Sequence, residues 1–99
     1  MDVKKAVELA GETQKKLDEK FGKHDAYRLV TELAEEVGEV AEAVKAEEGV
    51  AGKEKHRGNI GGELADVLYS VLVLSQKYGT NLDKDFQKVI DGINERYLK

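Results

Sequence analysis

Two short acidic motifs in this chain have the residue types and the spacing of a metal site. They are Glu36-x-x-Glu39 and Glu63-x-x-Asp66, and the 23 residues from Val40 to Gly62 separate them. Residues three apart lie on adjacent turns of one helix face, so each motif presents two carboxylates together. If two such helices face each other, four carboxylates converge and a cation must hold them. Because all the ligands are oxygens, we expect Mg²⁺, with Mn²⁺ as the alternative.

A solvated acidic surface is the competing interpretation. The first motif belongs to an acidic row that also contains Glu32, Glu35 and Glu42. The second motif favours the metal site, because Leu64–Leu74 is apolar on all sides and predicts a buried helix in which Asp66 is the only charge. A buried carboxylate needs a positive partner, and no Lys or Arg lies between residues 63 and 76. The partner must therefore come from elsewhere, and a bound cation meets this need.

The two motifs lie in the second and third of four predicted helices. Apolar residues at spacings of three and four predict helices over residues 2–21, 26–48, 60 or 62–78, and 82–97, and no segment has the alternation of a strand. Asp2, Asp25 and Asn81 are expected to cap three of them. Gln14 takes the one polar place in the apolar stripe of the first helix. The predicted fold class is all-α, a four-helix bundle formed by a single domain over residues 1–99.

Composition limits the partners and the location. The chain has a formal charge of −4, no Cys, no Pro, no Trp and two Phe. An acidic chain is not expected to bind a nucleic-acid polymer, and without Cys it has no disulfide or thiol nucleophile. A small aliphatic core and an all-apolar helix predict that the protein completes its burial in a dimer or a larger assembly, such as a dimer of dimers. With no signal peptide and no apolar run long enough to span a membrane, the protein is expected to be cytoplasmic.

Histidines and glycines leave further alternatives open. A ferritin-like di-iron site needs Glu-x-x-His pairs, and neither His24 nor His56 follows a Glu by three residues. Gly38 costs about 1 kcal/mol of helix propensity relative to Ala; it either permits close approach of another helix or leaves room for a ligand. The connection Gly49–Gly62 contains five glycines. Its basic side chains are either solvated or form a lid, in which Lys53, Lys55 or Arg57 swings over a bound polyphosphate.

The acidic motifs resemble those of a known family. Glu35-Glu36-Val37-Gly38-Glu39 with Glu63-Leu64-Ala65-Asp66-Val67-Leu68 is similar to the MazG-type all-α nucleoside triphosphate pyrophosphohydrolases, and the resemblance extends over roughly Ala26 to Tyr97. It implies an enzyme that hydrolyses an NTP or dNTP to the monophosphate and pyrophosphate with Mg²⁺. By position, the residues that match the family's metal ligands are Glu36, Glu39, Glu63 and Asp66. The family also implies a dimer or tetramer.

The resemblance and the chemistry suggest two further residues at the acidic site. Phosphoryl transfer depends on charge neutralisation and on positioning of the attacking water. Glu35 is the next carboxylate in the motif and is the candidate for orienting that water, although an exposed helical Glu is an equal alternative. Tyr69, three residues after Asp66, either stacks on a nucleotide base or packs in the core. The chain lacks the Trp residues that some relatives use around the base, so a tight base-specific pocket is not expected.

The remaining candidate substrate contacts lie outside the two acidic helices. Phe21 and His24 match an aromatic residue and a His that the family carries before its first acidic helix; a plain surface turn is the alternative there. Lys88, Asn94 and Arg96 are similar to the basic and Asn residues of the family's last helix.

Three functions are compatible with these residues. The first is an NTP or dNTP pyrophosphohydrolase that clears unwanted nucleotides. The second is a relative specific for dUTP, dCTP or phosphoribosyl-ATP. The third is a non-enzymatic helical oligomerisation module whose acidic residues hold a structural cation.

Overall fold

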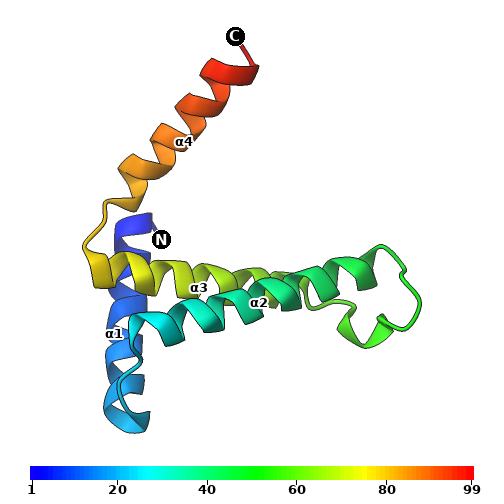
Figure 1. Ribbon diagram of the computed structural model, residues 1–99, viewed down its shortest axis with the longest axis horizontal. Helices are drawn as coiled ribbons and strands as arrows, with labels where there is room; N and C mark the ends of the chain where they lie inside the picture. Colours follow the sequence, from blue (N-terminus) through cyan, green and yellow to red (C-terminus); the bar gives the residue numbers. More distant parts are fainter.

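The computed structural model describes all 99 residues, and helices are its only regular elements (Figure 1). The elements are α1 (Val3–Phe21), α2 (Ala26–Glu47), a single turn of 3₁₀ helix η1 (Glu54–His56), α3 (Ile60–Tyr78) and α4 (Leu82–Tyr97). The prediction of an all-α chain with four helices and no strand is confirmed.

Side-chain caps fix three of the helix starts. Each predicted cap accepts a hydrogen bond from the backbone N–H three residues later, at 2.7 Å for Asp2, 2.9 Å for Asp25 and 3.1 Å for Asn81. Gly79 ends α3 in the left-handed region with φ 61°, a conformation that a residue with a side chain rarely adopts. These local signals explain why the helix boundaries follow the sequence so closely.

The third helix is the centre of the protomer. α2 runs antiparallel beside α3, and α1 crosses α3 near the end of α3 that is close to Gly79 (Figure 1). The buried apolar cluster joins α1, α2 and α3 and consists of Ala10, Leu29, Leu72 and Val73. This core is small, because only 9 of the 99 residues are buried.

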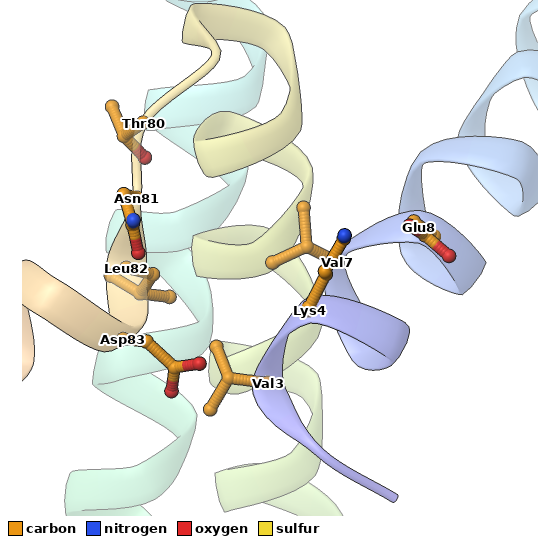
Figure 2. A pocket seen from close by; sticks show the side chains of 8 residues that line it. All are labelled: Val3, Lys4, Val7, Glu8, Thr80, Asn81, Leu82 and Asp83. Carbon is orange, nitrogen blue, oxygen red and sulfur yellow. The ribbon is translucent and has the colours of Figure 1, made fainter.

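The fourth helix leaves this body and carries the C-terminus away from it (Figure 1). A pocket of about 390 Å³ marks the joint, where Val3 and Val7 of α1 face Leu82 at the start of α4 (Figure 2). The radius of gyration is 16.1 Å, whereas a compact domain of this length has about 13 Å. Only α1, α2 and α3 therefore pack together, and the prediction that all four helices form one bundle within a single chain is wrong for α4. An amphipathic pattern predicts that one face of α4 is covered, but it does not say by which element.

Apolar residues on several helices consequently remain exposed. On α4 they are Phe86, Val89, Ile90, Ile93 and Tyr97. On α3, Leu64 and Leu68 are 52% and 54% exposed, and Asp66 is exposed beside them. The prediction that the whole run Leu64–Leu74 is buried is thus correct only for its second half, because nothing in a single protomer covers the first half. No helix has the length and apolar content needed to cross a membrane.

Candidate active site

A contact between α2 and α3 sets the register of the candidate site. The Ser70 hydroxyl on α3 donates a hydrogen bond to Glu36 Oε1 on α2. Asp66 lies four residues before Ser70 and Glu63 three before Asp66, so the three side chains form one row along α3. The contact at Ser70 shows that this row borders the acidic row of α2.

The register brings the two acidic motifs to matching levels. Both helices rise about 1.5 Å per residue and run in opposite directions. A step of three residues along each helix from the Glu36–Ser70 contact therefore brings Glu39 to the turn of α3 that contains Asp66. A second step brings Glu42 to the turn that contains Glu63. The register thus brings the backbone of the two acidic motifs level on two facing helices.

Cations compensate the two ends of the acidic row but not its middle. At one end, Arg28 Nε lies 3.2 Å from Glu32 Oε1. At the other end, Glu42 pairs with Lys53 at 2.5 Å and with Lys45 at 3.5 Å. The carboxylates between these ends on α2, and those of the facing motif on α3, make no ion pair. They are Glu35, Glu36, Glu39, Glu63 and Asp66. Five carboxylates of the two helices are therefore left without a protein cation.

The carboxylates do not converge in the protomer. No group of three or more His, Asp or Glu side chains lies close enough to hold a metal ion. Glu36 and Glu63 are half-buried, whereas Glu35, Glu39 and Asp66 are exposed. A Cβ added at Gly38 would meet no atom within 4 Å, so no helix approaches Gly38 closely in the protomer, and the room beside Glu39 is open.

A chain of hydrogen bonds links α3 to the joint between α1 and α2. The Tyr69 hydroxyl donates to Gln14 Oε1 at 2.8 Å, and Gln14 Nε2 donates to Asp18 Oδ1 at 2.8 Å. His24 Nδ1 lies 2.8 Å from the same Asp18 oxygen, and its Nε2 lies 3.8 Å from Glu32. This network connects the buried Gln14 to the first carboxylate of the acidic row.

The network shifts the pKa values of Asp18 and Tyr69. The hydrogen bond from Gln14, followed by those from His24, lowers the pKa of Asp18 despite opposing desolvation. Burial raises the pKa of Tyr69, and the charges of Asp18, Glu32 and Glu36 raise it further. Asp18 is therefore a carboxylate acceptor at neutral pH, and Tyr69 remains a phenol that can donate to Gln14.

Replacement of Gln14 by Leu is expected to destabilise the body of the protein. It leaves the Tyr69 hydroxyl without its acceptor and removes one of the hydrogen bonds to Asp18, and such losses cost about 1–2 kcal/mol in the free energy of unfolding. Urea unfolding measures the change. Gln87→Leu is the matched control, since Gln87 makes the same type of bond to a residue four later, Asp91, at 3.0 Å on the exposed surface of α4. Equal effects of the two variants would contradict a structural role for the network.

The predicted substrate contacts fall into two groups. His24 and Tyr69 lie in the network beside the acidic row, and Tyr69 also packs against the core cluster. Phe21 is 66% exposed at the end of α1, where the Lys20 ammonium lies 5.2 Å from its ring centroid. By contrast, three candidates lie on α4, a helix that leads away from α2 and α3 (Figure 1), and they are Lys88, Asn94 and Arg96. One protomer does not bring the two groups together.

Two contributors to the site did not follow from the acidic spacing. Ser70 binds Glu36 from 34 residues away, and Gln14 binds Tyr69 from 55 residues away. Gln14 carried a signal, because it is polar within an otherwise apolar stripe. The signal for Ser70 was its position one turn after Asp66 on the same helix face.

A comparison with known protein families decides the assignment. Residues 24–99, more than half of the chain, match the MazG nucleotide pyrophosphohydrolase domain. The chain belongs to the MazG family. Neither the curated proteins nor the solved structures include a significant match. The matched region starts two residues before α2 and contains both acidic motifs, so the resemblance predicted from them is confirmed.

The MazG match suggests a chemical role for the antiparallel pair α2 and α3, which carries both acidic motifs and is called the acidic hairpin below. MazG domains are typically metal-dependent and act on nucleotides. The helix α1 lies entirely before the matched region, yet it supplies Gln14 and Asp18 to the network beside the MazG motifs. α1 therefore acts as a structural support for the MazG helices.

Proposed function

We propose that this chain is a metal-dependent nucleoside triphosphate pyrophosphohydrolase that converts an NTP or dNTP to the monophosphate and pyrophosphate. One observation carries the proposal: carboxylates on facing turns of α2 and α3 have no protein cation, whereas the neighbouring Glu32 and Glu42 do. In a MazG chain, this pattern is what a site for a metal–triphosphate complex requires. The whole of residues 1–99 would act as one domain, in the cytoplasm, where nucleotides occur.

Four residues are proposed to hold the metal: Glu36, Glu39, Glu63 and Asp66. Their oxygens fit Mg²⁺ or Mn²⁺, and both helices offer them at matching levels. When bound, the cation supplies neutralisation of the phosphate charge. Glu35 lies one turn before Glu39 and is exposed, which suits it to orient a water molecule and accept its proton. Ser70 would keep Glu36 aimed at the site.

The functional unit is proposed to be a homodimer or a homotetramer. The apolar face of α4 has no partner within the protomer, and Phe86 on it is 62% exposed. Leu64 and Leu68, which neighbour Asp66 on α3, are also exposed. A second copy covers both surfaces with the same chemistry, and it would allow Lys88 and Arg96 of one copy to approach the acidic hairpin of another. Packing of a second copy would also draw the carboxylates closer together.

Product analysis tests the proposed reaction. The purified protein with Mg²⁺ is expected to convert at least one common NTP or dNTP to monophosphate and pyrophosphate, and EDTA is expected to stop the reaction because no cation then neutralises the phosphates. Ion-exchange separation of the products identifies the bond that is cleaved. Diphosphate with free phosphate would mean that a different bond breaks. Turnover of dUTP, dCTP or phosphoribosyl-ATP alone would select the substrate-specific alternative, and inactivity towards all of these would support the structural-cation module.

A further inference from the structure

The connecting loop, residues 48–59, is attached to the end of α2. The Gly58 N–H donates to Glu47 Oε1 at 2.7 Å. Lys53 Nζ lies 2.5 Å from Glu42 Oε2, and both side chains are about one-third exposed, at 35% and 28%. The loop therefore holds one specific ammonium group, that of Lys53, against the acidic face of α2.

This ammonium group lies at the edge of the candidate active site. Glu42 is one turn after Glu39 on α2, and the register set by the Glu36–Ser70 contact brings it level with Glu63 on α3. Lys45 is the other cation on Glu42, at 3.5 Å, but it belongs to α2 itself. The cations on α4 lie away from this hairpin (Figure 1). Arg57 of the same loop donates to the Ala46 carbonyl instead, so Lys53 is the loop cation that pairs with the acidic row of α2.

We propose that Lys53 is a phosphate-binding residue that pairs with Glu42 in the free protein and transfers to a non-bridging phosphate oxygen of the bound triphosphate. The inference rests on the proposed function. A triphosphate with one divalent cation is still an anion, and the charged residues proposed around the metal are all acidic. An ammonium group at the edge of the site therefore reduces the repulsion between the phosphates and these carboxylates.

The loop has the properties that this exchange needs. Gly49, Gly52 and Gly58 have φ values of 79°, 84° and 85°, so the backbone on both sides of Lys53 uses conformations open to glycine. Glu42 keeps a second cation, because Lys45 Nζ lies 3.5 Å from its Oε1, so the carboxylate still has a positive neighbour when Lys53 moves to the phosphate. Hydrogen bonding from Lys53 lowers the pKa of Glu42, which keeps the carboxylate ionised and the pair formed at neutral pH.

Steady-state kinetics of Lys53→Met tests the inference. The KM for the best Mg²⁺–nucleotide substrate is expected to rise about tenfold or more, since a charged hydrogen bond is lost, while kcat changes less. Lys45→Met and Lys55→Met are the matched controls; one removes the other cation on Glu42, and the other removes a loop cation without an ion-pair partner. Both are expected to stay within about twofold of the wild type in KM. An unchanged KM in Lys53→Met, or an equal rise in Lys55→Met, would overturn the inference.

Glu42→Gln separates phosphate binding from loop attachment. If Lys53 binds phosphate, this variant releases the ammonium group, and KM is expected to stay constant or fall. If Lys53 only anchors the loop, Glu42→Gln and Lys53→Met raise KM equally, and the inference is wrong. Wild-type turnover is measured first. An inactive wild type overturns the proposed function together with the inference. An active wild type whose KM is unchanged by Lys53→Met overturns the inference alone.

Discussion

Glu39→Gln is expected to reduce turnover by at least about a hundredfold while the protein stays folded. The substitution keeps the side-chain volume but replaces a charged metal ligand by a neutral one, and even supporting residues around metals contribute about 10–100-fold. Glu39 is exposed and makes no ion pair, so its loss leaves no buried group without a partner. Pyrophosphate release measures the rate, and calorimetric titration with Mn²⁺ is expected to show weaker binding.

The stability of this variant provides a second, opposite readout. Glu35 and Glu42 lie four before and three after Glu39 on α2, so removing the charge relieves repulsion by roughly a few tenths of a kcal/mol in metal-free buffer. Glu39→Gln should therefore melt at the wild-type temperature or slightly above it. Glu19→Gln on the exposed surface of α1 is the control and should keep full activity. A fully active Glu39→Gln protein would remove Glu39 from the proposed metal site.

Phe86→Glu is expected to break the assembly of the protein. A buried aromatic anchor at an interface contributes about 2 kcal/mol or more, so each lost anchor weakens association by roughly 30-fold, and a charged replacement adds a desolvation penalty. Light scattering coupled to gel filtration should give a dimer or tetramer for the wild type and a protomer for Phe86→Glu at micromolar concentration. Activity should fall with assembly, because the α4 candidates then reach no acidic hairpin.

Lys84→Glu serves as the control for this experiment. Lys84 lies on the side of α4 opposite to the apolar face, so the same Glu is introduced without touching that face. It should leave both the mass and the activity unchanged. A wild-type protein that remains a monomer at high concentration, or a Phe86→Glu protein that assembles normally, would rule out α4 as the contact between copies.

The sequence predicted the helices well because their signals are local. Apolar periodicity and the caps Asp2, Asp25 and Asn81 act over a few residues, and the structure contains all of them. The position of α4 did not follow, because its apolar face fits an intramolecular and an intermolecular partner equally. The same ambiguity explains why Leu64 and Leu68 are exposed although the sequence predicts that their helix is buried.

The composition of the candidate site stays a prediction from helical spacing, and spacing does not determine the shape of the site. Helical spacing was enough to place Glu36 with Glu39 and Glu63 with Asp66, and the antiparallel register of α2 and α3 brings the pairs level. The distance between the carboxylates depends on side-chain rotamers and on whatever packs against the hairpin, and neither is encoded in spacing. Contacts between distant residues, such as Ser70 with Glu36, became visible only in the fold.

The antiparallel pairing of α2 and α3 also bears on how the site forms during folding. All proposed metal ligands belong to one continuous helical hairpin, residues 26–78, closed by a connecting loop of 12 residues. The entropy lost on closing such a loop grows only with the logarithm of its length, and contacts between neighbouring helices favour rapid folding. The acidic hairpin can thus form early, and α1 then packs against a pair of helices whose two acidic motifs already face each other.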